Sequence, residues 1–461
     1  MTKKKIISMV IIMLFVMMGI IIAILSQNYQ ILAFILLADF LITLLMFVKE
    51  SQKKIIPIMY LISIFTFIFY LPFKNLIEQN NPMYNEKISF ITLIILIIAF
   101  NGMKIGLLLG DFKKKHAENQ DLKKKQNLSI AALLLVCMTA PAMIYRVYKD
   151  TLIVSTQGYA SLYQSVDTQL FERIANFNTA YIYIFLATLP SKKLLRKSYI
   201  IIIPLLLIDL LTGRRGIAIV NIMVLITYEI LRLVISNRNL NKLNFKYLFP
   251  ISLITIIVLF SANIVSQIRL DEQIKIESIF SSFFNQQSQT YEMIESSIYY
   301  APELKMISNN YSLQALYNGV KPLGVAMNWI LPENGQEEFF QSNLGNALTY
   351  IRDPIYYRLG GRFGTSYIAE LFLDFSYLGV FIFNLILGFI LSSISKSNFL
   401  NWITFSFVLF LVKTFYFLPR ESTFNAINQI LSVTNILAML TVWILSLVLK
   451  QKNREIINEE I

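Results

Sequence analysis

Long apolar runs separated by short polar segments are the most informative pattern in the chain. Twelve of these runs approach the length of a membrane-spanning helix, which needs about 20 apolar residues. They cover residues 6–26, 31–48, 55–72, 88–110, 128–147, 173–190, 198–211, 217–236, 247–267, 377–395, 398–418 and 426–449. Segment 198–211 is short unless it continues through the turn that follows it. The pattern predicts an all-α polytopic membrane protein with about 12 transmembrane helices.

Basic residues cluster in alternate gaps between these runs. Because Lys and Arg collect on the cytoplasmic side of a membrane, the clusters indicate orientation. They are Lys3–Lys5, Lys49/Lys53/Lys54, Lys113–Lys115 with Lys123–Lys125, Lys192/Lys193/Arg196/Lys197, Arg238/Lys242/Lys246, Lys396 and Lys450/Lys452/Arg454. Each cluster follows an even number of spans, which predicts that both termini are cytoplasmic and that the alternate loops face outward.

Composition supports a membrane protein and narrows its chemistry. Hydrophobic residues make up 56% of the 461 positions and charged residues 15%, with a mean hydropathy of +0.59. The net charge of +13 lies mostly in the clusters between spans, so it indicates topology rather than nucleic-acid binding. Cys137 and His116 are the single cysteine and the single histidine, so neither a disulfide nor a metal site is expected. The chain has no P-loop pattern, and no cofactor is expected.

The polar segments divide the chain into three regions. Residues 1–267 hold nine spans with short loops, residues 268–365 form a large extracytoplasmic loop, and residues 366–461 hold three spans and a cytoplasmic tail. A second outward loop, residues 148–172, is polar and rich in tyrosine. The first apolar run lacks a small-residue cleavage site and is interpreted as a retained helix. Abundant Ile, Lys, Asn and Phe indicate an AT-rich bacterial genome. The apolar spans and the basic clusters between them predict a location in the bacterial cytoplasmic (inner) membrane.

The first candidate site is the GRRG turn, residues 213–216, between two spans whose far ends are strongly basic. Arg214 and Arg215 therefore face outward, where the positive-inside trend does not explain them. The glycines allow a sharp turn, and guanidinium groups match phosphate oxygens in bidentate fashion. Asp209, in the preceding apolar run, is expected to pair with one of the two arginines. Contact with lipid headgroups is the alternative role for these arginines.

The second candidate is the run GGRFGTSYIAELFLDFSYLG, residues 360–379, where the large loop enters the next span. Glycines surround Arg362 and predict a flexible turn. Glu370 and Asp374 are four residues apart, which places them on one helix face near the outer boundary. A carboxylate there can orient or deprotonate a sugar hydroxyl, and Glu370 is the better candidate because it lies nearer the loop. The alternative is that both acids pair with structural arginines.

The third candidate is the turn FYFLPRES, residues 415–422. Arg420 is again an outer arginine, and Pro419 marks the end of the helix. Lys413 lies two turns earlier on the same face. A lysine inside a span indicates a functional site, unless its side chain extends to the interface.

Further outer arginines flank these segments. Arg352 and Arg358 precede Arg362, and Arg269 opens the large loop. Several arginines around one cavity suit an anionic lipid headgroup, in particular a diphosphate. Trp329 and the outer tyrosines can stack on sugar rings or anchor the protein at the interface.

Together these places resemble the oligosaccharide repeat-unit polymerases, the Wzy-type O-antigen and capsule polymerases. The resemblance lies in the GRRG turn, in the run G-R-x-G-x-S-Y-I-A-E-x-x-x-D-F-x-x-x-G and in the P-R-E-S turn. It extends to the topology of about a dozen spans with one dominant outer loop. The resemblance implies a transmembrane helix bundle of the GT-C glycosyltransferase type.

The resemblance also implies an activity. The protein would be a membrane glycosyltransferase that moves a growing glycan from polyprenyl (undecaprenyl) diphosphate onto a new lipid-linked repeat unit at the outer face. The catalytic residues would be Arg214, Arg215, Glu370 and Arg420. Substrate-binding residues would be Arg362, Lys413, Arg358, Arg352, Asp374 and Asp209. The implied partners are the lipid-linked oligosaccharide, the lipid bilayer, a chain-length regulator and a flippase, but no nucleic acid.

Three other functions fit parts of the pattern. A flippase for lipid-linked sugars predicts paired repeats and charges along a path through the bundle, whereas the charges here gather on one face. An O-antigen ligase of the expected kind uses an outer histidine, which this chain lacks. A non-catalytic membrane scaffold has no need of outward arginine turns.

Overall fold

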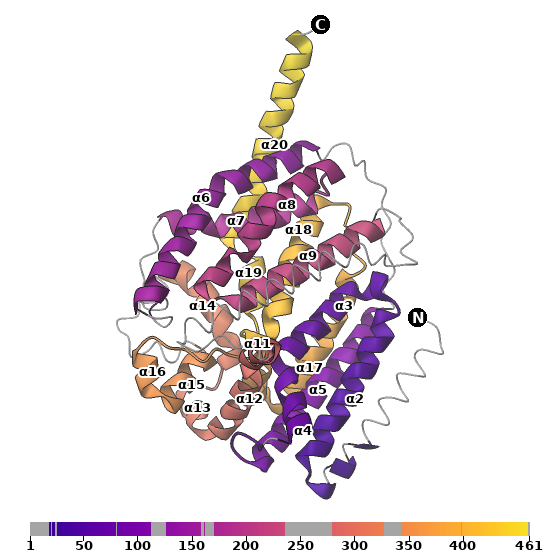
Figure 1. Cartoon of the computed structure of the whole chain (residues 1–461), viewed down its shortest axis with the longest axis vertical. Coiled ribbons are helices and arrows are strands. Elements are labelled where there is room, and N and C mark those ends of the chain that lie inside the picture. The colour runs from indigo at the N-terminus through magenta and orange to yellow at the C-terminus, as the bar shows by residue number, and fades with distance from the viewer. Residues whose placement is uncertain are drawn as a thin grey trace. The chain divides into compact units, whose positions relative to one another are not determined.

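The computed structural model of the chain is built from helices (Figure 1). It describes residues 18–19, 21–23, 25–79, 81–111, 126–157, 161, 170–235, 279–326, 343–397 and 399–459. Within these residues all regular secondary structure is helical and no strand occurs, which confirms the all-α prediction. The chain forms two compact units, each assembled from separate stretches of the sequence.

The first unit takes residues Met1–Lys115, Ser281–Lys396 and Phe415–Asn428. Its early helices are α2 (Tyr29–Val48), α3 (Ser51–Ile64), the π-helical turn η1 (Phe65–Phe69), α4 (Tyr70–Glu78) and α5 (Glu86–Gly110). The middle of the chain adds α11 (Ile279–Gln287), α12 (Gln289–Tyr299), α13 (Ala301–Ile307), α14 (Tyr311–Ala326), α15 (Leu344–Arg352), α16 (Pro354–Arg358) and α17 (Tyr367–Ile394). The 3-10 turn η7 (Leu418–Arg420) and the start of α19 (Asn425–Ile430) complete it.

The second unit takes residues His116–Phe280, Ser397–Thr414 and Gln429–Ile461. Its helices are α6 (Gln126–Gln157), α7 (Leu170–Ala187), α8 (Lys192–Leu207), the 3-10 turn η4 (Ile208–Thr212), α9 (Arg215–Ile235), most of α18 (Trp402–Phe417) and α20 (Val433–Glu459). The division into two units cuts across the three regions expected from the order of spans and loops, which remain a prediction.

Eight helices among the described residues are long and apolar enough to cross a membrane. They are Tyr29–Val48, Lys54–Glu78, Glu86–Gly110, Gln126–Gln157, Arg215–Ile235, Tyr367–Ile394, Trp402–Arg420 and Asn425–Gln451. Each covers all or most of one predicted span. The chain is therefore a multi-pass membrane protein.

The remaining four predicted spans are not among these eight, and the total of twelve stays a prediction. Segment 247–267 and most of 6–26 lie outside the described residues. Segment 173–190 largely coincides with α7, whose first turn carries Glu172 and Arg173. Segment 198–211 is covered by α8, which has 16 residues, and by the turn η4 that continues it.

Helices α5 and α17 approach each other closely along a row of glycines. Gly102, Gly106 and Gly110 recur every fourth residue on α5, so they lie on one face of that helix. A Cβ atom at Gly106 would clash with the backbone of Leu385 and Phe389 on α17. The missing side chains let the two backbones touch, as is common between membrane helices.

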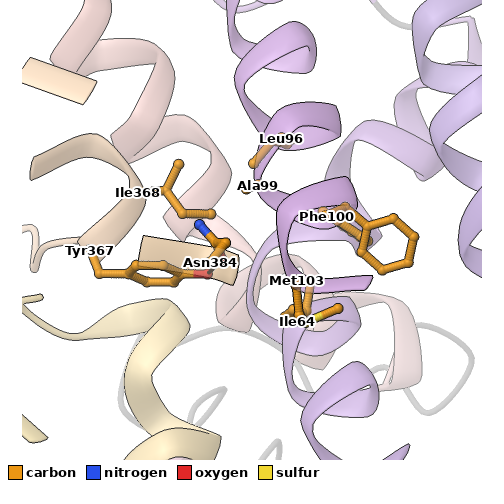
Figure 2. Close-up of a pocket in the computed structure, with 9 residues that line it drawn as sticks. Ile64, Leu96, Ala99, Phe100, Met103, Tyr367, Ile368 and Asn384 are labelled. Atoms are coloured by element: carbon orange, nitrogen blue, oxygen red, sulfur yellow. Dashed lines mark hydrogen bonds between the residues drawn. The ribbon is translucent and has the colours of Figure 1, made fainter. Parts of the chain in front are cut away.

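Helix α17 folds back on itself at Ser376, whose φ of 55° and ψ of −156° interrupt the helix. Tyr367 Oη donates a hydrogen bond to Asn384 Oδ1 at 2.8 Å, and the two side chains lie side by side in Figure 2. In a straight helix these residues, 17 positions apart, would be separated by about 25 Å. The rings of Tyr367 and Phe383 also lie 5.5 Å apart. α17 is therefore a helical hairpin with a short arm, residues 367–375, and a long arm, residues 377–394.

The hairpin places the non-helical segment 361–366 beside the long arm of α17. The long arm is about 27 Å long, close to the roughly 30 Å of a bilayer core, and its start agrees with the predicted span 377–395. Asn384 lies about 10 Å along this arm, so its partner Tyr367 lies at a similar depth. Residues 361–366 precede Tyr367 without helical structure. Gly361 and Ser366 at the ends of this segment are buried, and the four residues between them are half-buried. Residues 360–379 therefore reverse direction at Ser376, immediately before the predicted span begins.

Ionisable side chains inside the first unit are paired. Lys104 Nζ of α5 donates to both carboxylate oxygens of Asp39 on α2, at 2.7 and 2.5 Å, and both side chains are 2% exposed. Asp111, which follows α5, accepts hydrogen bonds from Lys54 of α3 and Ser392 of α17. These pairs fix how α2, α3, α5 and the long arm of α17 pack together.

The break at Ser376 makes a prediction about stability. A non-glycine residue with these backbone angles is strained by about 1–3 kcal/mol. Ser376→Gly is therefore expected to raise the free energy of unfolding by about 1 kcal/mol, measured by thermal unfolding in detergent. Ser395→Gly, at a position with ordinary helical angles, is the control and should not stabilise the protein. A Ser376→Gly protein that is less stable than wild type would contradict a strained hairpin tip.

Candidate functional site

The predicted site residues fall into two groups, one in each unit. The second unit contains Asp209, Arg214, Arg215 and Lys413. The first unit contains Arg352, Arg358, Arg362, Glu370, Asp374 and Arg420. Arg269 and Trp329 lie outside the described residues.

The GRRG turn connects η4 to α9 in the second unit. Gly213 adopts a φ of 83°, which glycine accepts without strain. The N–H groups of Gly213 and Arg214 close the turn on the carbonyl oxygens of Leu210 and Asp209. Arg215 opens α9 and is 6% exposed, whereas the side chain of Arg214 is 28% exposed. The turn thus buries one arginine and leaves the other accessible.

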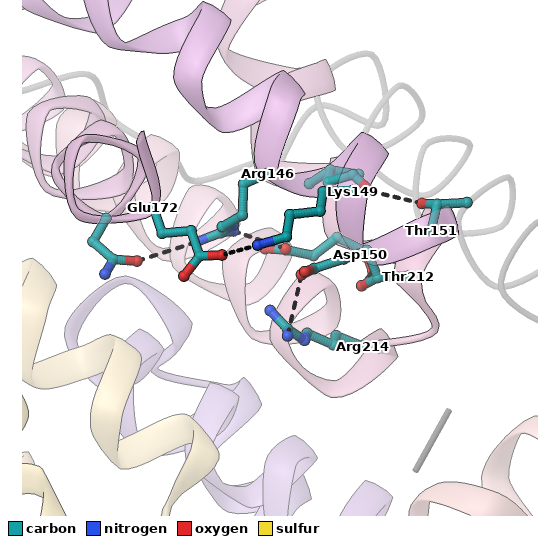
Figure 3. Close-up of polar contacts among 10 residues, drawn as sticks. Arg146, Lys149, Asp150, Thr151, Glu172, Thr212 and Arg214 are labelled. Atoms are coloured by element: carbon teal, nitrogen blue, oxygen red, sulfur yellow. Dashed lines mark hydrogen bonds and ion pairs between the residues drawn. The ribbon is translucent and has the colours of Figure 1, made fainter. Parts of the chain in front are cut away.

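The ion pairs at this turn differ from the expected pair between Asp209 and an arginine of the turn (Figure 3). Arg214 Nη2 lies 3.2 Å from Asp150 Oδ2 on α6. Asp209 pairs with Arg146 of α6 at 3.1 Å, so the expected pair between Asp209 and an arginine of the turn is wrong. The reason is that α6 packs against η4 and brings its own charged side chains to Asp209.

These pairs belong to a larger group of charges, which we call the α6 charge cluster. Lys149 of α6 pairs with Glu172 of α7 at 3.1 Å. Lys413 of α18 lies over the ring of Tyr183, 5.8 Å from its centroid, and interacts electrostatically with Asp209. The cations of the cluster are Arg146, Lys149, Arg214 and Lys413, and its carboxylates are Asp150, Glu172 and Asp209. Among the described residues, these four cations meet three carboxylates, so this part of the site carries an excess of positive charge.

In the first unit, the Glu370 carboxylate connects the second and third sequence motifs. Glu370 lies on the short arm of α17 and is 0% exposed. One oxygen accepts a hydrogen bond from the Thr365 hydroxyl at 2.8 Å. The other accepts from the backbone N–H and the hydroxyl of Thr423, both at 2.8 Å. Glu370 therefore holds together two half-buried segments that are not helical, residues 361–366 and the turn after η7.

Asp374 has a different partner from Glu370. Its carboxylate accepts hydrogen bonds from the backbone N–H groups of Tyr311 and Ser312, at 3.1 and 2.7 Å, and from the Ser312 hydroxyl at 2.6 Å. These are the first residues of α14, where N–H groups lack partners within the helix. Asp374 thus caps α14 and ties it to the hairpin. The alternative that Glu370 and Asp374 pair with arginines is wrong. The carboxylate oxygens of both residues accept hydrogen bonds from hydroxyl groups and backbone N–H groups instead.

Arg420 ends the short turn η7 and lies beside the segment that Glu370 binds. Its Nη1 donates to Gln287 Oε1 at 3.2 Å, which links the turn to the end of α11. Glu421 follows and accepts a hydrogen bond from Asn425 Nδ2 at 3.1 Å. Desolvation raises the pKa of Glu421 to about 7, although the Asn425 hydrogen bond and the charge of Arg420 act in the opposite direction.

The remaining arginines of the first unit lie among aromatic rings. Arg362 has its guanidinium 4.2 Å from the ring centroid of Tyr357, and it donates to the Tyr357 carbonyl oxygen at 3.0 Å. Arg352 lies over the ring of Phe363 at 4.8 Å. Arg358, the last residue of α16, is exposed.

A small cavity lies beside the hairpin and is shown in Figure 2. Tyr367 and Asn384 border it with their polar groups, while apolar residues of α3, η1, α5 and α17 supply the rest of the wall. By volume it accommodates about one water molecule. It therefore leaves no room for a sugar ring.

Sequence reasoning missed several residues of these groups. Arg146, Lys149 and Asp150 lie beyond or at the end of the predicted span 128–147, and residues 148–172 were expected to form a loop. In the structure α6 continues to Gln157, because the chain has no glycine or proline between residues 142 and 157. Three charges within five residues after an apolar run were the available signal. Thr423 gave no comparable signal, because a threonine hydroxyl is common in any turn.

The contacts of Glu370 make a prediction about stability. Glu370→Ala removes the acceptors of Thr365 and Thr423 inside the bundle, so we expect a loss of about 1–3 kcal/mol in the free energy of unfolding. Glu370→Gln keeps one acceptor oxygen and should lose less. Thermal unfolding in detergent measures both, with Glu303→Ala on the exposed side of α13 as the control. Equal unfolding temperatures for wild type and Glu370→Ala would show that the carboxylate does not hold the two segments.

Comparison with known proteins agrees with this arrangement. The family model for O-antigen polysaccharide polymerase Wzy matches residues 8–453, nearly the whole chain and all three motifs. No curated protein and no solved structure matches the chain. The family match and the eight apolar helices together indicate a membrane protein of polysaccharide biosynthesis. The resemblance found in the sequence is thereby confirmed, and the chain belongs to the O-antigen polysaccharide polymerase Wzy family.

Proposed function

We propose that the protein transfers a growing glycan from polyprenyl (undecaprenyl) diphosphate onto a new lipid-linked repeat unit. In each step a hydroxyl oxygen of the acceptor sugar forms a bond to the anomeric carbon of the donor. The bond between that carbon and the diphosphate oxygen breaks, and the hydroxyl proton passes to a base. Because the lipid diphosphate is the leaving group, the reaction needs no nucleotide. Membership of the polymerase family supports this reaction class.

The observation that carries the proposal is the accessible Arg214 guanidinium in a cluster of excess positive charge. Arg214 contacts Asp150 through Nη2, and its side chain is 28% exposed, so further N–H donors remain for a ligand. A diphosphate supplies the negative charge that the α6 charge cluster lacks. Paired N–H donors on such a group stabilise the charge that builds up as the glycosidic bond breaks.

Arg215, the buried arginine of the turn, also supports diphosphate binding. It is buried directly after Arg214, at the N-terminus of α9, where the helix dipole also favours an anion. We assign the leading role in diphosphate binding to Arg214 and Arg215. Lys413 and Asp209, which interact within the cluster, set the local charge.

The proposed roles in the first unit concern the sugars and the proton. Arg362 and Arg420 are proposed substrate-binding residues, and Arg352 and Arg358 extend this set. Both oxygens of Glu370 are engaged by Thr365 and Thr423, so we assign it to positioning the Arg420 turn rather than to proton transfer.

Glu421 is the better candidate for the general base. It lies next to Arg420 and has a pKa of about 7, at which a carboxylate is charged in about half of the molecules at neutral pH. A base works best when its pKa is close to the working pH. Asn425, which donates to it, would fix its orientation.

We further propose a GT-C-like bundle with its reaction at the outer face of the bacterial cytoplasmic membrane and with both termini in the cytoplasm. The basic clusters between the spans support this orientation. Repeat units would be delivered by a flippase, and a chain-length regulator would act on the product.

The role of the turn is tested with purified protein and lipid-linked repeat units. Wild-type protein is expected to give a ladder of lengthened products. Arg214→Ala should slow elongation by about 100-fold or more, because a donor to the leaving group is lost. Arg214→Lys should fall between the two, since it keeps the charge but not the planar fork. Arg173→Ala, at an exposed arginine of the same unit, is the control and should keep wild-type activity.

The same assay separates the competing functions. A flippase moves repeat units across vesicle membranes without lengthening them, and a ligase transfers them to an acceptor that is not a lipid-linked repeat unit. Full elongation by a folded Arg214→Ala, Arg215→Ala double variant would show that the turn takes no part in the mechanism.

Glu421 makes a prediction about pH. The base must be ionised, so elongation should be fast above pH 7 and should fall as the pH decreases through about 7. Glu421→Gln is expected to slow elongation by about 100-fold or more and to abolish this pH dependence. Rates measured between pH 5.5 and 8.5 test both points, with Glu86→Gln at an exposed position as the control. A wild-type pH profile in Glu421→Gln would assign the base to another residue.

A further inference from the structure

Three tyrosines gather on the part of the first unit that the sequence assigns to the outer loops. Tyr84 lies in the connection before α5, Tyr299 ends α12, and Tyr300 precedes α13. The rings of Tyr84 and Tyr299 stack with centroids 4.4 Å apart and an interplanar angle of 17°. Tyr300 packs edge-on against both rings. We call these residues the tyrosine platform.

One ring of the platform is accessible. Tyr84 covers one face of Tyr299, yet Tyr299 remains 46% exposed, so its other face is open. Glu303 and Lys305 on the adjacent helix α13 are also exposed. A surface that presents charged side chains beside the ring is one that faces water rather than lipid tails.

Hydrogen-bonding groups border the platform. The hydroxyl oxygens of Tyr84 and Ser296 are 2.8 Å apart, and Arg352 Nη1 donates to Ser296 Oγ at 3.4 Å. Glu292, one turn before Ser296 on α12, interacts electrostatically with Arg352. The platform therefore combines an aromatic face with guanidinium and carboxylate groups at its edge, while the Ser296 hydroxyl is buried and links Tyr84 to Arg352.

This combination matches the chemistry of a sugar ring. The C–H groups on one face of a pyranose pack against an aromatic ring, while its hydroxyls both donate and accept hydrogen bonds at the edge. A lipid tail would gain nothing from the charged edge. A phosphate would gain nothing from the open ring face, because that face carries partial negative charge.

We propose that the tyrosine platform is a glycan subsite, which binds one neutral pyranose of the glycan chain through the open face of Tyr299. The proposal rests on the proposed function, which places a glycan on this side of the membrane. The sugar bound here takes no part in bond formation. By holding the chain between steps, the subsite would favour repeated extension of the same glycan.

The test compares variants of Tyr299 in the elongation assay and in direct binding. Tyr299→Ala should raise the KM for the lipid-linked repeat unit about threefold to tenfold, the usual range for one aromatic contact, and leave kcat unchanged. It should also shorten the product ladder. Binding of the soluble repeat-unit oligosaccharide, without lipid diphosphate, should weaken by a similar factor in titration calorimetry.

Matched variants separate stacking from folding. Tyr299→Phe and Tyr299→Trp keep an aromatic face and should behave as wild type, whereas Tyr299→Leu keeps much of the volume and should behave as Tyr299→Ala. Met306→Ala, at an exposed position of α13, is the control and should change neither KM nor binding. Unchanged KM and unchanged binding in Tyr299→Ala or Tyr299→Leu would overturn the subsite.

The outcome is distinguishable from failure of the proposed function. A wild-type protein that makes no ladder rejects the polymerase reaction, while calorimetry still decides whether the platform binds the oligosaccharide. A normal wild-type ladder with unaffected Tyr299 variants rejects the platform alone.

Discussion

Backbone N–H and C=O groups inside a bundle of apolar helices must find their hydrogen-bond partners within the protein, because the membrane offers none. The first unit meets this constraint at two half-buried breaks in its helices, residues 361–366 and the turn after η7. Glu370 bridges them by accepting from Thr365 and from Thr423. A charged acceptor fixes both segments in one geometry, and so fixes the place of Arg420. Glu370 thus satisfies the backbone N–H of Thr423 in the turn, while Thr349 Oγ1 accepts from the N–H of Phe363 in the other segment.

The second unit must compensate the charges of side chains that lie among apolar helices. Ionised side chains near apolar helices are costly unless they are paired, and the α6 charge cluster pairs most of its members. Pairing holds Arg146 and Arg214 in fixed positions but leaves an excess of cations. In the proposed reaction, this excess of positive charge is arranged in advance for the lipid diphosphate.

The hairpin of α17 connects the membrane helices to the helices of residues 281–366. Its long arm packs on α5 through glycines, while its short arm carries Glu370 and ends near Asp374, which caps α14. The helices that form the tyrosine platform belong to the same unit. A substrate held at these helices would therefore be positioned relative to the Arg420 turn by the packing of one unit.

The sequence by itself determined the all-α class, eight of the predicted apolar spans and the family motifs. These features depend on the length of apolar runs and on residues adjacent in the chain, and both are local properties. The tertiary structure alone decided which charges meet. Asp209 pairs with Arg146, which lies 63 residues away in the sequence, and Glu370 accepts a hydrogen bond from Thr423, which lies 53 residues away. It also decided that α17 reverses at Ser376, where the sequence has neither glycine nor proline to signal a break. Hydrogen bonds and ion pairs depend on distance in space, and packing between helices sets that distance.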